Sequence, residues 1–319
     1  MNRLTEPIPV GHPSFLNAPR CTDLETLDAD IGVIGVHSGV PYGIMGSTFP
    51  AGAALGTIRE QSTRFERFLT HYDYDFGGDI FAGRAVRIVD CGNVAMVPGQ
   101  YETNNQATSA VVRAIIDRGA VPIVIGGGHE ITIPVLRAYD GLPPMYVGQI
   151  DAHFDWRDEV DGVRNGLSSP MRRASEMPWV HGMAQIGLRG VGSARQEEVD
   201  AARAWGSLVV GAQELHRDGV AAVLARLPDA ECYFITFDAD GLDPTLAPGV
   251  GAPAFGGVTY YEALNLLRGI AAKGKIVGFD FVVVRPHLDI KHLTSHIAAR
   301  MILNMIGAMA HTGQIGTAG

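Results

Sequence analysis

Six side chains that could bind metal ions follow three apolar runs of the sequence. They are His129 after VPIVIGGG, Asp151, His153 and Asp155 after MYVGQI, and Asp238 and Asp240 after CYFITF. In an extended chain residues two apart point to the same side, so this spacing predicts that each set converges. Four carboxylates held close together would repel one another unless cations lay among them. The residues therefore predict a site for two divalent metal ions.

The composition of the site narrows the choice of metal. Carboxylates with some imidazole and no thiolate favour hard or borderline ions, so Mn²⁺ is predicted, with Ni²⁺, Fe²⁺ or Co²⁺ as alternatives. Taken singly, each of these residues is more often a helix cap or a loop residue. Six of them at the ends of three predicted strands favour the metal site. Asp243, which precedes Pro244, is predicted to fix the turn or to support a bound ligand.

Short apolar runs alternate with segments of helical length along the chain. The predicted strands are Ile31–Val36, Val86–Val89, Val121–Ile125, Met145–Ile150, Met183–Leu188, Ser207–Val210, Cys232–Phe237 and Lys275–Phe279. The predicted helices are Thr108–Asp117, Ile131–Ala138, Gln196–Trp205, Val220–Leu227, Thr259–Ala272 and Thr294–Met309. This alternation predicts an α/β fold, a three-layer α/β/α sandwich with a mainly parallel sheet. In such sheets, sites form at the carboxyl ends of the strands.

Composition and charge limit the classes of protein to which this chain can belong. Of the 319 residues 46% are hydrophobic and 18% are charged, and no apolar run approaches the 18 or so residues of a membrane span, so no membrane segment is expected. A net charge of −9 without a Lys/Arg block argues against a nucleic acid partner. The first residues lack the apolar core of a secretory signal, and a cytoplasmic location is predicted.

No composition shift divides the greater part of the chain. Residues 1–30 are Pro-rich and predicted to form an N-terminal extension, and residues 31–319 are predicted to form a single catalytic domain. Residues 40–56 are rich in small and polar side chains and are predicted to form a loop that lines the pocket.

Three motifs resemble the signatures of the ureohydrolase superfamily, the arginases and agmatinases. They are GGGHE at 126–130, DAHFD at 151–155 and FDADGLDPTLAPGVGAPAFGG at 237–257. Their order extends the resemblance over most of the chain, and the agmatinase branch fits best. The resemblance implies an arginase-like fold, a binuclear manganese centre, hydrolysis of a guanidinium C–N bond and trimeric or hexameric assembly. It also implies that the six residues named above are the metal ligands.

The mechanism that follows is a hydrolysis of a guanidine-type compound. Two cations lower the pKa of a bridging water, and the resulting hydroxide attacks the guanidinium carbon. Asp155 is predicted to hydrogen-bond that hydroxide and to pass a proton to the departing amine.

Two positions depart from the family's pattern. Leu167 stands where a proton-shuttling histidine is usual, and Val283 stands where a glutamate usually holds the substrate guanidinium. A less polar pocket suits an alkylated guanidine or a biguanide such as metformin, with agmatine or a guanidino acid as alternatives. Further substrate contacts are predicted among four residues near the motifs, namely Glu130, Trp156, Asp158 and Glu159.

The same two departures are also compatible with a protein that is not an enzyme. A metal-binding but non-catalytic subunit could support a related chain in a hetero-oligomer. The presence of all six ligands favours an active enzyme instead. A deacetylase of related fold would use a single zinc, and the paired DxHxD and DxD motifs count against it.

Overall fold

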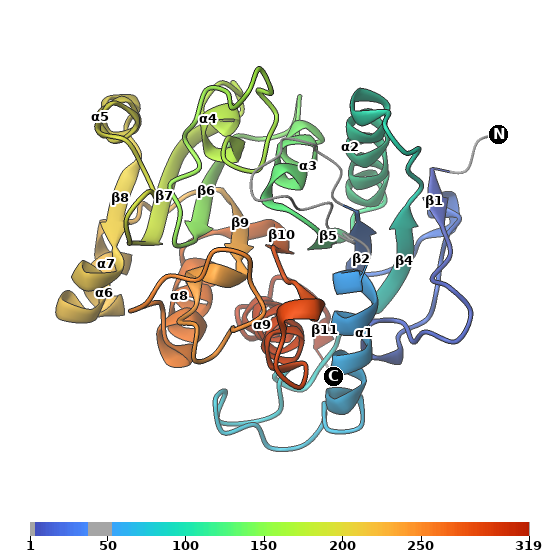
Figure 1. The fold of residues 1–319 in the computed structure, drawn as a ribbon. Helices are drawn as coiled ribbons and strands as arrows, with labels where there is room; N and C mark the ends of the chain where they lie inside the picture. The colour runs from blue at the N-terminus through green and yellow to red at the C-terminus, as the bar shows by residue number, and fades with distance from the viewer. Residues whose placement is uncertain (1–3, 38–52, 319) are drawn as a thin grey trace.

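The computed structural model describes residues 4–37 and 53–318, and a nine-stranded sheet forms the centre of this part of the chain (Figure 1). The strands lie in the order β1-β4-β2-β5-β10-β9-β6-β7-β8. Their bounds are β1 (Thr5–Glu6), β2 (Ile31–Val36), β4 (Ile88–Val94), β5 (Val121–Gly126), β6 (Met145–Ile150), β7 (Val180–Leu188), β8 (Leu208–Gly211), β9 (Cys232–Asp238) and β10 (Lys275–Val282). Neighbouring strands are parallel, except that β1 runs antiparallel to β4. A separate pair joins β3 (Arg84–Ala85) to β11 (Thr317–Ala318).

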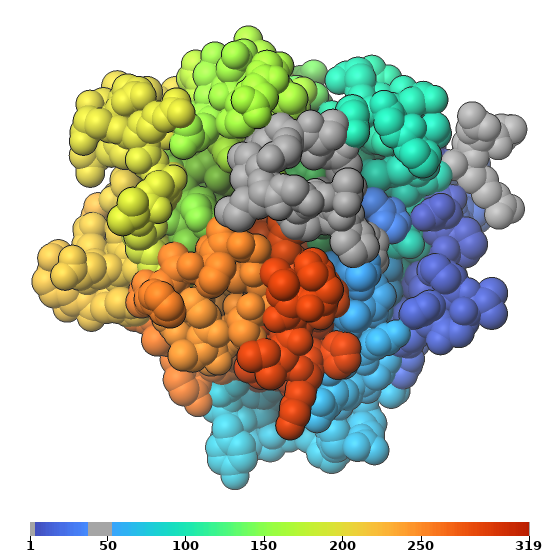
Figure 2. All heavy atoms as spheres, viewed as in Figure 1, coloured from blue at the N-terminus to red at the C-terminus, as the bar shows by residue number. Residues whose placement is uncertain are grey.

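Helices cover both faces of the large sheet. They are α1 (Ala53–Glu66), α2 (Tyr101–Asp117), α3 (Thr132–Arg137), α4 (Pro170–Ala174), α5 (Gln196–Trp205), α6 (Ala212–Asp218), α7 (Val220–Arg226), α8 (Tyr260–Lys273) and α9 (Leu293–His311). One core cluster contains side chains of α1 and α6 to α9, and the other contains side chains of α2 to α5. Helices α1 and α9, far apart in the sequence, lie side by side on the first face (Figures 1 and 2). The predicted three-layer α/β/α sandwich is confirmed.

The strands are buried on both faces, as their sequences predict. Successive side chains of a strand point to opposite sides, so Val33 belongs to one core cluster and Ile34 to the other. Likewise Ile123 and Ile125 enter the first cluster, whereas Val124 enters the second. The apolar runs therefore carry no alternation of polar and apolar residues.

The carboxyl ends of four central strands meet at one edge. Strands β5, β10, β9 and β6 are consecutive neighbours in the sheet. His129 follows β5, Asp151 follows β6, Asp238 ends β9 and Val283 follows β10. The topology thus brings together segments that lie more than a hundred residues apart in the chain.

Several predicted elements needed correction at their ends. The helix expected from Thr108 begins at Tyr101, and the strand expected at Val86–Val89 runs from Ile88 to Val94. Helices α1, α4 and α6 were not predicted. Helices α4 and α6 have only five and seven residues, too few to show a helical period, and the start of α1 falls in the segment predicted as a loop. Most of the predicted pocket loop, residues 40–56, lies outside the described residues, and its end forms the start of α1.

Residues 4–30 pack against the edge of the sheet. β1 pairs with β4, and Phe15 is fully buried, with its backbone N–H donating to Oδ2 of Asp90 at 2.8 Å. Asp90 also pairs with the buried Arg59 of α1 at 2.8 Å. The division of the chain at residue 30 stays a prediction. Within residues 4–37 and 53–318, no helix is long and apolar enough to span a bilayer.

Candidate metal centre

The six predicted ligands lie together at the carboxyl ends of β5, β6 and β9. Two groups of three residues offer ligand atoms that lie within 4.8 Å of one another: His129, Asp151 and Asp238, and Asp151, His153 and Asp240. Asp151 belongs to both groups. Its Oδ2 atom lies 3.1 Å from Nδ1 of His129, and its Oδ1 atom lies 3.6 Å from Nδ1 of His153. One carboxylate therefore faces both groups, with one oxygen toward each.

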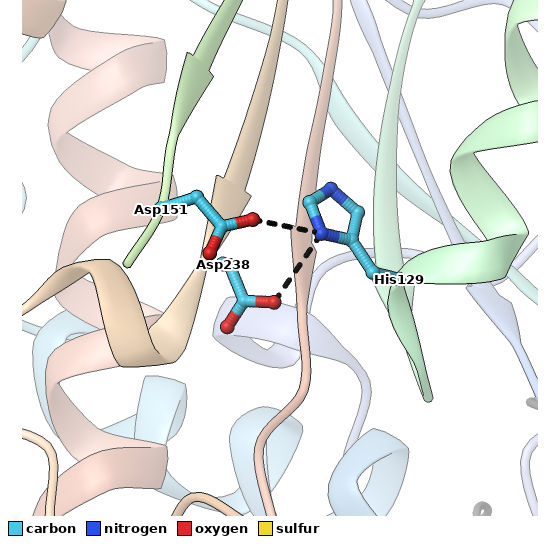
Figure 3. Close-up of side chains that lie close together, drawn as sticks. All are labelled: His129, Asp151 and Asp238. Carbon is cyan, nitrogen blue, oxygen red and sulfur yellow. Dashed lines mark ion pairs between the residues drawn. The ribbon is translucent and has the colours of Figure 1, made fainter. Parts of the chain in front are cut away.

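Buried carboxylates converge on His129, whose side chain is 1% exposed (Figure 3). Its Nδ1 atom lies 2.8 Å from Oδ2 of Asp155, 3.1 Å from Oδ2 of Asp151 and 3.3 Å from Oδ2 of Asp238. None of these approaches has the direction of a hydrogen bond. Because buried nitrogens normally make a directed hydrogen bond, this arrangement is better suited to a metal ion between the nitrogen and the oxygens.

The spacing of two between ligands arises from turns and not from extended strands. β6 ends at Ile150, and Oδ1 of Asp151 accepts a hydrogen bond from the N–H of His153 at 2.6 Å. After β9, Oδ1 of Asp238 accepts from the N–H of Asp240 at 2.9 Å, at the start of a 3₁₀ turn. Both are turns in which an aspartate bonds its own backbone two residues on. The predicted convergence is seen, but the extended backbone expected for it is not.

A close approach of two backbones explains the glycine in the third motif. A Cβ atom on Gly241 would lie 2.9 Å from the backbone nitrogen of Asp151 and 2.9 Å from the carbonyl oxygen of Ile150. A side chain at this position would push the two ligand turns apart. The segments therefore pack as one unit, and the N–H of Ala152 donates to Oδ1 of Asp240 at 3.4 Å.

Burial and mutual charge shift the proton affinities of the cluster. Burial and the charge of Asp151 raise the pKa of Asp155 to about 6, and burial raises the pKa values of Asp238 and Asp240. Burial opposes protonation of His153, but its interactions with the carboxylates of Asp151 and Asp240 outweigh this effect and raise its pKa to about 12. Without cations, the cluster therefore takes up protons to balance its carboxylates. Bound cations would replace those protons.

Two polar side chains behind the ligands were missed by the sequence analysis. Oγ1 of Thr236 lies 2.9 Å from Nε2 of His129, and Nε2 of Gln149 donates to Oδ2 of Asp151 at 2.7 Å. A hydrogen bond at Nε2 fixes the imidazole with Nδ1 toward the carboxylates. Thr236 and Gln149 each precede a ligand by two residues within an otherwise apolar strand. A polar residue in that place was the signal that could have identified them.

Arg189 was also missed, and it organises the long third motif. It follows β7, and its guanidinium donates to carbonyl oxygens of five residues at 2.6 to 3.2 Å: Gly187, Asp240, Gly241, Leu242 and Ala254. Asp243 closes the same loop, with Oδ2 accepting from the N–H groups of Gly256 and Gly257 at 3.0 Å each. Asp243 thus fixes a turn, which was one of the two roles predicted for it.

The two positions that depart from the family's pattern lie beside the ligand turns. Val283 donates its N–H to the carbonyl of Gly127 at 2.7 Å and has a φ of +68°. Leu167 is half-buried in a turn tied to the segment just after the second motif, since the N–H of Arg157 donates to the carbonyl of Ser168 at 2.9 Å. Positive φ is costly for a β-branched residue, so the backbone at Val283 is strained.

The remaining predicted substrate contacts lie in different surroundings. Glu130 is buried in the turn after His129 and lines a small cavity of about 20 Å³ with residues of β2 and α2. Trp156 is 3% exposed and packs edge-on against Trp205 in the core. Asp158 and Glu159 are exposed on the surface. Asp158 pairs there with arginines, and the hydrogen bond from Arg173 lowers its pKa. Their roles toward a substrate stay predictions.

The donor set fits two divalent cations. It offers four carboxylates and two imidazoles, and the three cysteines of the chain are free thiols elsewhere in the fold. Such oxygen-rich sites with some imidazole suit hard or borderline ions and exclude a thiolate-type structural zinc site.

Known proteins share both the sequence and this fold. A guanidinopropionase of Pseudomonas aeruginosa is 32% identical over 95% of this chain and 93% of its own length. A mitochondrial agmatinase of Gallus gallus is 31% identical over 93% of this chain and 86% of its own. The structure of proclavaminate amidino hydrolase from Streptomyces clavuligerus covers 98% of this chain and 100% of that chain, with a TM-score of 0.78 and 27% identity. The profile of the Arginase family matches residues 29–307. The resemblance predicted from the three motifs is therefore confirmed, and the chain belongs to the Arginase family.

Proposed function

We propose that this protein is a binuclear metal-dependent hydrolase that cleaves a C–N bond of a guanidine-type compound. The observation that carries the proposal is the pair of His/Asp groups that share the buried Asp151. A single structural metal would need only one of these groups. The names of the relatives, a guanidinopropionase and an agmatinase, support a guanidino compound as the substrate class.

The proposed ligand sets follow the two groups, with one added carboxylate. His129, Asp151, Asp155 and Asp238 would hold one cation, and Asp151, His153 and Asp240 the other. We propose Mn²⁺ as the resident metal and Ni²⁺ as the alternative. When bound, the two cations supply the Lewis acidity that makes hydrolytic attack on a guanidinium carbon accessible near neutral pH.

Asp155 is the proposed proton carrier. In the hydrolysis, water adds to the guanidinium carbon, the C–N bond breaks, and the nitrogen leaves as an amine after gaining a proton. Asp155 is buried at the site, with Oδ2 2.8 Å from Nδ1 of His129. A carboxylate held at this place could accept a proton from the attacking water and return it to the departing amine.

The substrate is proposed to carry an alkylated guanidine or a biguanide, with metformin as one compound to assay. Leu167 and Val283 are half-buried apolar side chains beside the ligand turns, and neither can hydrogen-bond a guanidinium N–H. An N-alkyl group would bury apolar surface against them without leaving a buried donor unpaired. Agmatine and the guanidino acids are the competing substrates in the same assay.

The assembly and location also belong to the proposal. We propose a trimer or hexamer, either of this chain alone or with a related chain, and light scattering of the purified protein measures which. A cytoplasmic location stays a prediction of the sequence.

The deciding experiment measures metal content and turnover on the same preparation. The purified chain is reconstituted with Mn²⁺ or Ni²⁺, analysed for metal, and assayed for release of urea-type products and amines. The substrates are alkylated guanidines, biguanides, agmatine and guanidino acids. Two cations per chain with turnover of any of these supports the enzyme. Two cations with no turnover favours a non-catalytic subunit of a hetero-oligomer, and no bound cation overturns the metal centre.

A further inference from the structure

A line of buried polar side chains leads away from the metal centre through the sheet. Gln149 on β6 and Gln185 on β7 are fully buried, and Ser207, the residue before β8, is 7% exposed. The two glutamines are register partners on the neighbouring strands. Buried polar groups are costly unless every donor and acceptor is used, so such a line within apolar strands requires a reason.

Each side chain in the line is bonded to the next. Ser207 Oγ donates to Oε1 of Gln185 at 3.0 Å, and Nε2 of Gln185 donates to Oε1 of Gln149 at 2.8 Å. Nε2 of Gln149 donates in turn to Oδ2 of Asp151 at 2.7 Å. The second proton of each amide is also used. Gln185 donates to the carbonyl of Phe154 at 2.7 Å, and Gln149 donates to the carbonyl of His153 at 3.3 Å.

The orientation of the two amide groups, and so the donor-to-acceptor order along the line, is fixed by the carbonyl groups beside them. The carbonyl oxygens of His153 and Phe154 can only accept hydrogen bonds, so the NH₂ group of each glutamine must face them. With the amides in this orientation, Gln149 presents a donor to Asp151 and leaves its oxygen for Gln185. Turning either amide over would place oxygen against oxygen at hydrogen-bond distance. The line therefore always ends in a donor aimed at Asp151.

We propose that Gln149 and Gln185, supported by Ser207, are positioning residues for the metal centre. They hold Asp151 as a hydrogen-bond acceptor with Oδ2 turned toward His129. This inference rests on the proposed function, because it concerns the two cations that Asp151 would share. The bonded oxygen, Oδ2, is the one that faces the group of His129 and Asp238, whereas Oδ1 is held by the N–H of His153. The line should therefore act on the cation in the first group more than on the cation in the second.

The test is a titration of the metal-free protein with Co²⁺, followed by visible absorption and calorimetry. The variants Gln149→Met, Gln185→Met and Ser207→Ala cut the line at successive distances from Asp151. Met183→Leu, at a fully buried position on β7 outside the line, is the matched control. The expected result is that one of the two binding steps weakens about tenfold or more in Gln149→Met, less in Gln185→Met and least in Ser207→Ala. The other step should stay within a factor of two or so of the unaltered protein.

The thermal unfolding of each metal-free variant separates positioning from folding. If the variants lose stability without metal while both binding steps stay unchanged, the line is only structural and the inference fails. Equal weakening of both steps would also overturn it, because the line then has no preferred group. An unaltered protein that binds fewer than two Co²⁺ ions contradicts the proposed function itself. Two bound ions with the expected gradient, in a protein without turnover, would support the line and reject only the catalytic role.

Discussion

The backbone N–H of His153 donates to Oδ1 of Asp151 at 2.6 Å, so the carboxylate common to both ligand groups is oriented by a residue that belongs to only one of them. The two positions should therefore differ in what they do to metal content. Replacing Asp151 removes an oxygen from each group, whereas replacing the side chain of His153 leaves the backbone donor and the first group in place.

The first prediction follows from this difference. Asp151→Ala should lose most of both cations, and His153→Ala should retain about one cation per chain. Elemental analysis after reconstitution and desalting measures both. Asp158→Ala, which removes an exposed carboxylate outside the two groups, is the control and should keep the full metal content. Equal metal loss in Asp151→Ala and His153→Ala would contradict the assignment of Asp151 to both sites.

The clustering of the proposed ligands could be predicted from the sequence, but the backbone conformation that produces it could not. Residue type and strand ends identified Asp151 and Asp238, since sheet topology brings the ends of β6 and β9 together. Spacing alone could not distinguish a pleated strand from a turn closed by the aspartate itself, because both place residues i and i+2 near each other. The side chains behind the ligands depend on strand neighbours. Gln185 bonds Gln149 only because β7 lies beside β6.

Most of the longer helices were predictable from their amphipathic pattern, although α1, with 14 residues, was not predicted. Gln196–Trp205 was predicted with the bounds of α5, and Thr259 was predicted at the start of α8, where it forms a capping box with Glu262. The single-turn helix α4 contains too few residues to show a period. Its position is set instead by tertiary contact, since the carbonyl of Asp155 accepts the N–H groups of Met171 and Arg172 at 3.1 and 3.3 Å.

The second prediction concerns substrate choice. Val283→Glu should place a carboxylate beside the ligand turns and shift preference toward unsubstituted guanidinium groups. The expected change is about tenfold in the ratio of kcat/KM for agmatine to that for an N-alkylated guanidine, or about 1.4 kcal/mol of transition-state binding. Val10→Glu adds the same charge at a fully exposed position and should leave the ratio unchanged. An unchanged ratio in Val283→Glu would remove Val283 from the substrate contacts.

The third prediction concerns Arg189, whose guanidinium binds five carbonyl oxygens around the third motif. Lysine has three donors on a single nitrogen and cannot reach all five, so Arg189→Lys leaves buried carbonyls unpaired. The free energy of unfolding should fall by roughly 2–4 kcal/mol, measured by urea denaturation of the metal-free protein. Arg203→Lys, on the exposed face of α5, is the matched control and should change it by less than about 0.5 kcal/mol. Similar losses in both variants would mean that the network contributes little.

The fourth prediction uses Asp280, a fully buried carboxyl group within β10 that accepts a hydrogen bond from Oγ1 of Thr132 at 2.8 Å. Burial raises its pKa to about 6 in the folded chain, above the value of about 3.9 expected in the unfolded chain. The folded state therefore prefers the protonated form. Its contribution to stability is complete below about pH 4 and is lost as the pH rises through 6.

Asp280→Asn keeps an acceptor for Thr132 but cannot ionise, so it should remove this pH dependence. Between pH 4 and pH 7, the metal-free protein should lose roughly 2–3 kcal/mol of unfolding free energy relative to the variant. Denaturant unfolding of both proteins across this range, with a chelator present, measures the difference. Parallel stability curves would show that Asp280 does not change its protonation in this range, and a loss that grows toward low pH would reverse the sign of the effect and reject the account.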